Sequence, residues 1–235
     1  MSSVSIVIPV KDCEPTIEKS ISSVINQTYQ DFEVILVDNG CEDKTIELAR
    51  DIGKDKVKVF ECKTPGIVPA LNTGLQKAKY DIIARQDGDD IWYPDKLEKQ
   101  IKLLDNNPSI SICGTQIRLI SKNNEVVDEG FRYPLNDQLI KSWLLTGRNA
   151  IAHPSAVFRK SILLRVGGYD DTYPVAEDHH LWLRCIKWFN FCNLPEVLVD
   201  YTSTHNPKYD PKFPLFASES QYKLLKYSGF IRHVN

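Results

Sequence analysis

The densest group of potential metal ligands is the run Asp87-Gly88-Asp89-Asp90. Three carboxylates within four residues repel one another unless a cation lies among them. Divalent ions such as Mn²⁺ and Mg²⁺ prefer oxygen ligands of this kind. The run therefore predicts a metal site, with a solvated acidic turn or a phosphatase-type nucleophilic aspartate as the alternatives. A calcium loop of the EF-hand type is disfavoured because Trp92 stands where that loop requires glycine.

A second group of titratable residues, Glu177-Asp178-His179-His180, is predicted to open a helix. Acidic residues near a helix N-terminus are stabilised by the helix dipole, which needs no catalytic role. A carboxylate on a rigid helix can also serve as a general base that takes a proton from a hydroxyl group. The adjacent histidines face different sides of a helix and are not expected to share one site. Whether His153 or His179 contacts a metal or substrate stays open at this point.

The first half of the chain alternates buried strands with amphipathic helices. Strands are predicted at residues 4–8, 32–37, 57–59 and 80–84, and helices at 17–25, 42–52, 70–78 and 94–104, the last with Pro94 in its first turn. Strands separated by helices build a mostly parallel α/β sheet, which binds ligands at the carboxyl ends of its strands. Asp38 and the 87–90 run both follow predicted strands, so these acids are expected at one edge.

The second half is less regular, and we expect a single domain that spans residues 1–235. The pattern predicts a hairpin of 116–120 and 125–127, helices at 136–145 and 177–186, and strands at 155–158 and 196–201. Gly167-Gly168 is typical of a helix C-cap followed by a turn. Residues 206–214 contain three prolines and predict a loop, and a final helix is expected at about 215–226.

Composition excludes several classes of protein. The 29 Lys and Arg residues against 31 Asp and Glu leave a net charge of −2, whereas nucleic-acid binding normally needs a basic excess. The apolar runs are far shorter than the ~20 residues of a spanning helix, and the N-terminus is unlike a signal peptide. A cytoplasmic protein is therefore expected. The six scattered cysteines form no CxxC pair, which favours reduced, packed thiols over a zinc site.

Several motifs occur in a recognisable order. In the first half they are Val7-Ile8-Pro9-Val10-Lys11-Asp12, Ser23-Val24-Ile25-Asn26-Gln27-Thr28-Tyr29, Phe32-Glu33-Val34-Ile35-Leu36-Val37-Asp38-Asn39-Gly40, Ala70-Leu71-Asn72-Thr73-Gly74 and Ile83-Ala84-Arg85-Gln86-Asp87-Gly88-Asp89-Asp90. In the second half they are His153-Pro154-Ser155, Gly167-Gly168-Tyr169-Asp170 and Glu177-Asp178-His179-His180-Leu181-Trp182-Leu183-Arg184. Over about residues 4–201 this order and spacing resembles family 2 inverting glycosyltransferases of the GT-A fold.

The resemblance implies a metal-dependent enzyme that moves a sugar from a nucleotide-sugar donor, preferentially a UDP-sugar, to a hydroxyl of a glycan or glycolipid. It implies a mostly parallel sheet with a smaller acceptor-side sheet. It divides the chain into a donor-binding half of about 1–115, an acceptor-binding half of about 116–205 and a C-terminal loop and helix of about 206–235.

The resemblance also assigns roles on the donor side. Pro9 and Val10 match positions that meet the nucleotide base, Asp38 matches the acid that reads uracil, and Glu14 matches an acidic position beside the donor pocket. In the DxD motif, the first acid lies near the ribose and the second holds Mn²⁺ or Mg²⁺ on the diphosphate. The residues that match this motif and its neighbouring cation are Asp87, Asp89 and Arg85.

On the acceptor side, Asp178 matches the catalytic base, and Glu177 is the less favoured candidate. In-line attack by a hydroxyl with one base inverts the anomeric centre, so no nucleophilic Ser or Cys is required. Asn39 and Cys41 replace the family's common Asp and Ser, and Leu71 stands where many members carry Arg. Because of these departures, the sequence does not determine which nucleobase and which sugar the donor carries.

Two other functions remain as alternatives. A sugar-phosphate nucleotidyltransferase normally carries a glycine-rich phosphate loop after its first strand, which residues 9–12 lack. A non-catalytic carbohydrate-binding protein needs no intact set of acids, yet this chain has one. The final helix is expected to dock on the core. Its basic and aromatic residues leave a weak contact with the inner face of a membrane as the alternative.

Overall fold

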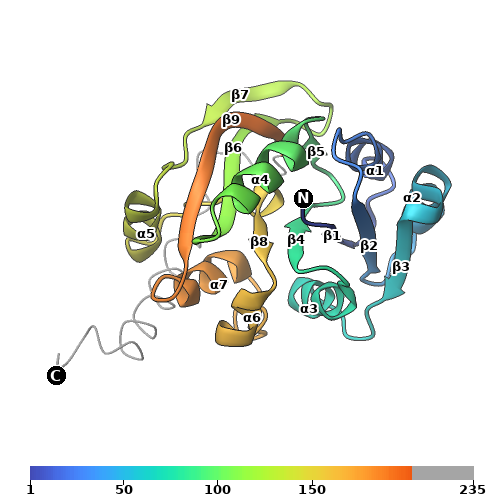
Figure 1. Ribbon diagram of the computed structural model, residues 1–235. Helices are drawn as coiled ribbons and strands as arrows, with labels where there is room; N and C mark the ends of the chain where they lie inside the picture. Colours follow the sequence, from blue (N-terminus) through green and yellow to red (C-terminus); the bar gives the residue numbers. More distant parts are fainter. Residues whose placement is uncertain (203–235) are drawn as a thin grey trace.

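A nine-stranded sheet runs through the computed structural model, which describes residues 1–202 (Figure 1). The strand order is β3-β2-β1-β4-β8-β6-β9-β5, with β7 paired to β6. The strands are β1 Val4–Val10, β2 Phe32–Asp38, β3 Val57–Glu61, β4 Ile82–Arg85, β5 Ile91–Trp92, β6 Ile110–Ile120, β7 Val126–Phe131, β8 Val157–Arg159 and β9 Asn190–Thr202. The helices are α1 Ile17–Ile25, α2 Thr45–Gly53, α3 Ile67–Lys77, α4 Lys96–Asn106, α5 Asp137–Leu145, α6 Ser161–Val166 and α7 Glu177–Cys185, with short 3-10 turns at Lys54–Lys56 and His153–Ser155.

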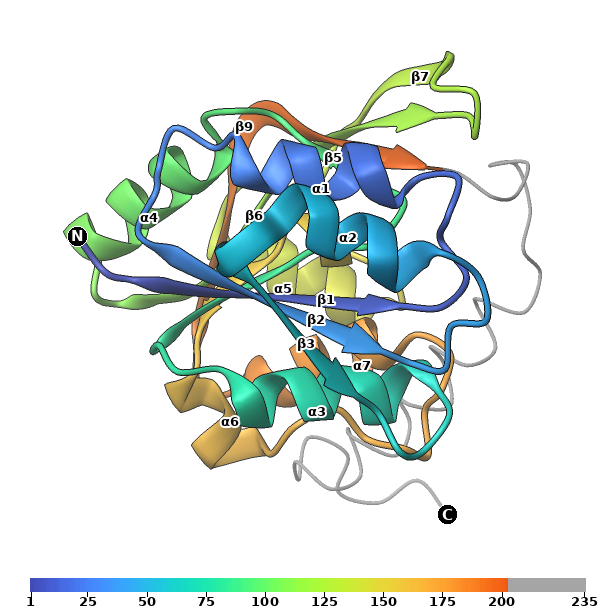
Figure 2. The same cartoon turned by 90° about the vertical axis from the view of Figure 1, so that its right-hand side faces the viewer.

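Helices cover both faces of this sheet, and each face has its own apolar core (Figure 2). On one face, α1, α2 and α4 contribute to the buried cluster that contains Ile6. On the other, α3, α5, α6 and α7 contribute to the cluster that contains Val7. Neighbouring residues of a strand point to opposite faces, so a strand buried on both sides reads as a continuous apolar run. This explains the run Val4–Val10, which is buried throughout.

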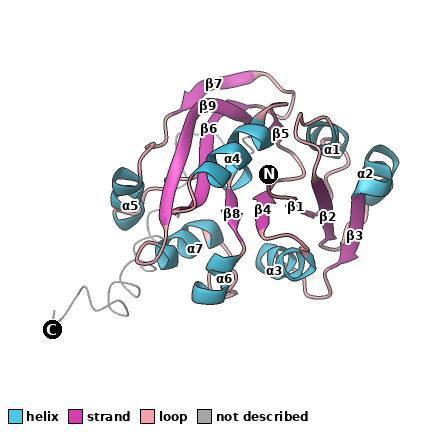
Figure 3. Ribbon diagram, in the orientation of Figure 1, coloured by secondary structure: helices cyan, strands magenta, loops and turns pink. Residues whose placement is uncertain are grey.

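The strand directions bring several loops to one edge. β1, β2, β3 and β4 are parallel, and β8 is antiparallel to both β4 and β6. Because β6 and β9 are parallel to each other, both run in the direction of β4. The carboxyl ends of these strands and the beginning of β8 therefore lie at the same edge of the sheet. The smaller acceptor-side sheet that we expected continues the parallel one through β8 (Figure 3).

The expected elements form, with corrections at their ends. The hairpin, the helix at 136–145 and the glycine C-cap are confirmed: β6 pairs with β7, Asn136 caps α5, and Gly167 ends α6 with φ +76°. The helix expected from 42 begins at Thr45, because the Glu42 N–H is held at 2.8 Å by Asp12 Oδ1 in the preceding loop.

Other boundaries were wrong by a few residues. The strand expected at 80–84 is β4, Ile82–Arg85, and the helix expected from Pro94 is α4, which starts at Lys96. The strand expected at 155–158 is β8, Val157–Arg159, because the preceding residues form the 3-10 turn His153–Ser155. The strand expected at 196–201 is the longer β9.

None of the helices in residues 1–202 is long and apolar enough to cross a lipid bilayer. The six cysteines are all free thiols, as expected. The loop expected at 206–214 and the helix expected at 215–226 lie outside the described residues, and so does the membrane contact considered for that helix.

Candidate active site

The acidic loop 87–90 leaves the end of β4 and is fixed through its backbone. The side-chain hydroxyls of Ser20 and Thr16, from α1 and its N-cap, donate hydrogen bonds to the carbonyl oxygens of Asp87 (2.7 Å) and Gly88 (3.0 Å). From the end of β9, the Thr202 hydroxyl donates to the carbonyl oxygen of Asp89. Two distant parts of the chain, the start of α1 and the end of β9, thus hold this loop at the sheet edge.

Glycine is required at position 88 by close packing. A Cβ atom there would lie 2.9 Å from both Cys13 Sγ and Val10 Cγ1. The first strand's end therefore packs directly against the acidic loop. This contact joins Val10, an expected base-binding residue, to the expected metal ligands.

The acidic side chains of this loop lie close enough to share one cation. Asp87, Asp89 and Asp90 each offer one carboxylate oxygen within 4.8 Å of the others. Burial and the charge of Asp87 raise the pKa of Asp89 to about 6 and that of Asp90 well above its usual value. Asp90 Oδ2 is buried with no hydrogen-bond partner among the described residues. A divalent cation would relieve both the repulsion and the unpaired oxygen, so the donor set fits Mn²⁺ or Mg²⁺.

Arg85, the last residue of β4, lies beneath these acids. It is only 4% exposed, and its Nη1 atom pairs with Asp87 Oδ2. Burial lowers the pKa of this guanidinium, but the charge and hydrogen bond of Asp87, together with the charges of Tyr169 and Glu177, raise it overall. Arg85 is therefore a fixed cation that holds one oxygen of Asp87, as expected from its position in the sequence.

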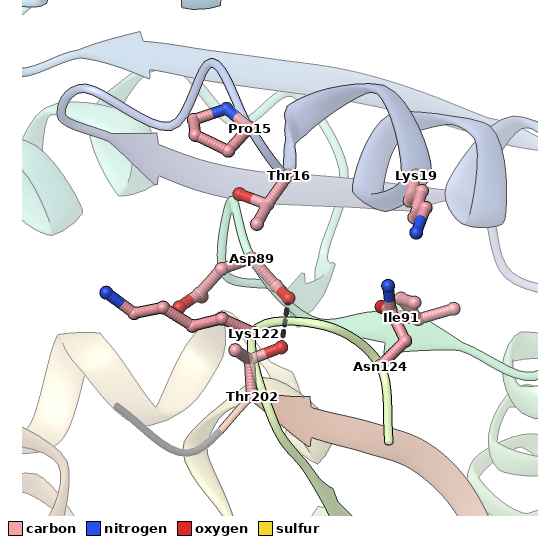
Figure 4. Close-up of a pocket in the computed structure, with 8 residues that line it drawn as sticks. All are labelled: Pro15, Thr16, Lys19, Asp89, Ile91, Lys122, Asn124 and Thr202. Atoms are coloured by element: carbon pink, nitrogen blue, oxygen red, sulfur yellow. Dashed lines mark hydrogen bonds between the residues drawn. The ribbon is translucent and has the colours of Figure 1, made fainter. Parts of the chain in front are cut away.

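A pocket opens beside Asp89, between α1 and the tip of the β6–β7 hairpin (Figure 4). The space between its lining residues is about 300 Å³, and part of this space is open to solvent. Lys19 and Asn124 point toward each other across it, and the Lys122 side chain runs alongside Asp89. The hairpin was expected from the sequence, but its approach to the acidic loop was not. It adds a cationic side chain to the acidic edge.

On the donor side, Asp38 and Val10 are neighbours in register at the ends of β2 and β1. Asp38 Oδ1 accepts hydrogen bonds from the backbone N–H groups of Gly40 (3.0 Å) and Cys41 (2.8 Å), which shapes the loop after β2. Pro9 is buried, and Val10 is only 2% exposed, so these residues shape the site through packing and backbone rather than through reactive groups.

Glu14 has a contact that its expected role does not require. Its Oε2 atom accepts a hydrogen bond from the Lys44 N–H at 3.1 Å, and its own N–H donates to Asp43 Oδ2 at 3.0 Å. These bonds join the loop after β1 to the start of α2. Glu14 therefore helps to shape the rim next to Asp38, and its contact with a donor stays a prediction.

On the acceptor side, Asp178 is the second residue of α7 and is only 7% exposed. Its Oδ2 atom accepts a hydrogen bond from Asn149 Nδ2 at 3.2 Å, and its Oδ1 atom accepts one from the His179 N–H at 2.7 Å. Both oxygens are thereby oriented. Ala176, just before the helix, adopts the left-handed region with φ +64°. Asn149 carried no motif that would have identified it from sequence.

Glu177 lies beside His153 rather than beside Asn149. Glu177 Oε1 is 3.5 Å from His153 Nδ1, and the carboxyl side chain is 14% exposed. Burial raises the pKa of Glu177. His153 Nε2 is 2.8 Å from the Tyr169 hydroxyl, and burial together with the charge of Arg85 lowers the pKa of His153 to about 3. The imidazole is therefore neutral and contacts Tyr169 and Glu177.

Asn72 of α3 fixes the position of Tyr169. Its Nδ2 atom donates to the Tyr169 carbonyl at 2.8 Å, and its Oδ1 atom accepts from the Tyr169 N–H at 2.9 Å. A Cβ atom on Gly168 would lie 2.4 Å from Asn72 Oδ1, so glycine is needed for this approach. The sequence motifs contained both segments, but their pairing appears only in the fold.

The two adjacent histidines diverge, as predicted. His180 stacks on Tyr173 with ring centroids 3.8 Å apart, whereas His179 interacts with the backbone of Leu144 on α5. Burial lowers the pKa of both, to about 4 for His180. In the described part of the chain, neither belongs to a group of three potential metal ligands.

The acidic loop and the start of α7 belong to one electrostatic environment. The charges of Arg85 and Asp87 both act on Glu177 and on His153. Asp178 acts on His153 as well. An acidic loop at the carboxyl ends of parallel strands, together with a carboxylate at the start of a helix, is the arrangement that the resemblance to GT-A transferases led us to expect.

Sequence comparison gives the family. Residues 5–167 match the family described as Glycosyl transferase family 2. The O-antigen biosynthesis glycosyltransferase WbnJ of Escherichia coli is 35% identical over 209 residues, which cover 84% of this chain and 78% of WbnJ. The amylovoran biosynthesis glycosyltransferase AmsE of Erwinia amylovora is 28% identical over 241 residues, 99% of this chain and 89% of AmsE. The chain belongs to glycosyl transferase family 2 and is a glycosyltransferase.

Solved structures confirm the fold. S. aureus TarS 1-349 in complex with UDP-GlcNAc superposes with a TM-score of 0.75 at 17% identity, over 95% of this chain and 66% of that one. Mannosyltransferase PcManGT from Pyrobaculum calidifontis, in complex with GDP-Man and Mn²⁺, gives 0.66 at 17% identity, over 99% and 76%. The chain spans only 38% of a longer TarS structure. At this identity the likeness shows the GT-A-like fold.

Proposed function

We propose that this glycosyltransferase transfers a sugar from a UDP-sugar to a hydroxyl of a glycan or glycolipid, with inversion at the anomeric carbon. The proposal rests on the shared edge of the sheet, where the charges of Asp87 and Asp178 act on the same buried groups, His153 and Tyr169. The donor-binding half is about residues 1–115, and the acceptor-binding half begins at about 116.

The relatives support the donor and acceptor classes. TarS was solved with UDP-GlcNAc, whereas PcManGT was solved with GDP-Man and Mn²⁺. WbnJ and AmsE are named for O-antigen and amylovoran biosynthesis, which are both polysaccharides. UDP is the preferred nucleotide because Asp38 occupies the expected uracil-reading position at the end of β2. A GDP-sugar is the second candidate, because Asn39 and Cys41 stand in place of the family's usual residues and leave the nucleotide base open.

Asp89, with Asp87, would hold Mn²⁺ or Mg²⁺. When bound, the ion neutralises the charge that grows on the diphosphate leaving group. Arg85 keeps Asp87 in place through its ion pair, and Ser20, Thr16 and Thr202 hold the loop backbone. Because these contacts are made by buried groups, the acids are oriented before the donor arrives.

Asp178 takes the proton from the attacking acceptor hydroxyl. Asn149 holds one carboxylate oxygen of Asp178 and the His179 N–H holds the other, so the base is fixed on the rigid start of α7. An aligned base contributes about 10²–10⁴-fold to a proton-transfer step. The acceptor oxygen attacks the anomeric carbon as the bond to the nucleoside diphosphate breaks, and the proton goes to Asp178.

The experiment that tests the proposal is a thermal scan with UDP or GDP, each with Mn²⁺ or EDTA. It is followed by UDP release from UDP-glucose, UDP-galactose and UDP-GlcNAc. UDP at 100 times its Kd should raise the free energy of unfolding by about 2.7 kcal/mol, and only with the metal. Asp89→Asn should abolish that gain, whereas Asp55→Asn, an exposed acid on Lys54–Lys56, should keep it. A gain with GDP but not with UDP would show that the donor carries guanine rather than uracil.

Transfer itself is tested by the catalytic aspartate. Asp178→Asn should lower turnover at least 100-fold while leaving the UDP-dependent thermal gain intact, because Asp178 serves the acceptor and not the diphosphate. Turnover near the wild-type value would show that another group is the base. Release of pyrophosphate from a nucleoside triphosphate would instead favour a nucleotidyltransferase, and nucleotide binding without any transfer would favour a carbohydrate-binding protein.

A further inference from the structure

Two buried side chains, Tyr169 and His153, and the partly exposed Glu177 form a series of contacts that the proposed mechanism does not use. The Tyr169 hydroxyl lies 2.8 Å from His153 Nε2, and His153 Nδ1 lies 3.5 Å from Glu177 Oε1. Tyr169 and His153 are only 5% and 7% exposed. Each comes from a different segment of the acceptor half, so only the fold brings them together.

The hydrogen-bonding chemistry of these three groups determines which atom donates and which accepts in each contact. A neutral imidazole has one N–H donor and one acceptor nitrogen. A carboxylate accepts only, so His153 Nδ1 must carry the proton that faces Glu177. Nε2 is then the acceptor, and the Tyr169 hydroxyl donates to it. The backbone of Tyr169 makes two hydrogen bonds with the Asn72 side chain, one accepted and one donated. The first residue of this series of contacts is therefore fixed in place.

The neighbouring rings hold the imidazole in its plane. The His153 ring centroid is 5.5 Å from that of Tyr169 and 6.4 Å from that of Trp182, which meets it edge-on at 84°. Glu177 Oε1 therefore faces a fixed donor, while the side chain keeps 14% of its surface exposed. An oriented, partly exposed carboxylate can accept a hydrogen bond from a ligand hydroxyl.

We propose that Tyr169 and His153 are positioning residues that orient Glu177 to bind a second hydroxyl of the acceptor sugar, while Asp178 takes the proton of the first. This inference rests on the proposed function. It makes Glu177 a specificity-determining residue for acceptors that carry a second hydroxyl beside the reacting one, because adjacent residues of α7 point in different directions and would meet different hydroxyls. The 3.5 Å contact is long for a hydrogen bond, and we expect it to shorten when the acceptor binds.

The matched test compares Tyr169→Phe with Tyr29→Phe. Tyr29 is also buried, at 8% exposed, and its hydroxyl donates to the Ser2 carbonyl at 3.0 Å, far along the chain from the acceptor segments. UDP release would be measured with UDP-GlcNAc and p-nitrophenyl glycosides of glucose, galactose and N-acetylglucosamine. Tyr169→Phe and Glu177→Gln should raise the KM for the glycoside about tenfold, with the UDP-dependent thermal gain unchanged. Tyr29→Phe should leave that KM unchanged.

A spectroscopic readout tests the orientation without turnover. In ¹⁵N imidazole spectra of the wild type, the His153 signals are those that disappear in His153→Gln. They should show a protonated Nδ1 and an unprotonated Nε2. Tyr169→Phe should shift the Nε2 signal. Protonation at Nε2 instead would overturn the inference.

Equal KM values for Tyr169→Phe and Tyr29→Phe in an enzyme that transfers sugar would overturn the inference and leave the proposed function standing. No UDP release by the wild type with any pair of substrates would overturn both.

Discussion

Gly74 is the glycine whose replacement gives the sharpest test of how α3 packs on the sheet. A Cβ atom at this position would lie 2.3 Å from Val7 Cγ1 and 3.3 Å from Val37 Cγ2. Ordinary contact begins at 3.4 Å, so the Val7 side chain or the helix must move by about 1 Å. Val7 is 1% exposed on the central strand β1 and has little room to move.

The magnitude follows from two opposing terms. Forcing an extra methyl into a packed core costs about 1–3 kcal/mol, and the 2.3 Å contact puts this case at the upper end, about 2–3 kcal/mol. Replacing a helical glycine by alanine gains about 1 kcal/mol in helix propensity. Gly74→Ala should therefore lower the free energy of unfolding by about 1–2 kcal/mol. For a chain of this size, that is a fall in Tm of about 2–8 °C.

The sign of the effect should reverse when Val7 is truncated. Val7→Ala removes two buried methyl groups and should cost about 2–3 kcal/mol, including the cavity that it leaves. In that background, the methyl of Gly74→Ala enters the empty space, and the propensity gain remains. Gly74→Ala should then stabilise Val7→Ala by up to about 1 kcal/mol.

Thermal scans of the four proteins measure this cycle, with chemical denaturation to give the free energies. Equal destabilisation by Gly74→Ala in both backgrounds would refute the packing argument, because the two sites would then be independent. The matched comparison is Gly40→Ala, where no atom lies within 4 Å of the added Cβ and the cost comes from φ +85° alone. That cost should be the same with and without Val7→Ala.

Three further effects follow from strain and burial. Ala176→Gly should raise the Tm by about 2–4 °C, because Ala176 sits at φ +64° where a Cβ costs about 1–2 kcal/mol; an unchanged or lower Tm would contradict this. Lys96→Met should stabilise by about 1–3 kcal/mol, and more at lower pH. The fully buried Lys96 amine has no hydrogen-bond partner among the described residues, and burial holds its pKa well below the usual value. His153 and His180 have pKa values lowered to about 3 and about 4, so the unfolded chain binds more protons below pH 6.5. Stability should fall as the pH drops, by about 3–5 kcal/mol for each at full protonation, and His180→Gln should flatten an acid titration of Tm.

The sequence predicted the first half well because its signals are local. A strand buried on both faces is a continuous β-branched run, and a helix that covers it has one apolar stripe, so β1, α1 and β2 followed directly from Val4–Asp38. The acidic loop was found for the same reason, since three carboxylates in four residues are visible without any fold. Its metal-ligand geometry agrees with that prediction, while the metal itself stays proposed.

The second half was harder because its signals are not local. β9 begins at Asn190, six residues before the expected strand, and it contains Pro195, which lacks the N–H of a ladder bond. The structure absorbs this proline in a register shift, where Gly114 and Gln116 of β6 oppose Asn193 and Val197. The hydrogen bond from Thr202 to the acidic loop therefore depends on a strand that is longer than the sequence pattern predicted.

The same difficulty explains why the supports of the two carboxylates were missed. Asn149 lies in a loop 29 residues before Asp178, and Asn72 lies 97 residues before Tyr169. Asparagine is common in loops and helices, so neither residue type nor spacing distinguishes a side chain that orients a base. Such residues become visible only when the sheet brings their segments together.

The reversal of strand direction at β8 accounts for the construction of the site. A purely parallel sheet would place only strand ends and their following loops at this edge. Because β8 is antiparallel to β4, the beginning of β8 lies at this edge, together with the preceding turn His153–Ser155. This turn lies beside Arg85, since the Arg85 backbone N–H donates to the Ala156 carbonyl at 3.0 Å. Since β6 and β9 resume the direction of β4, the hairpin tip and Thr202 arrive at the acidic loop from the other side. One antiparallel strand thus sets His153, from the half that we propose binds the acceptor, next to Arg85, from the half that we propose binds the donor.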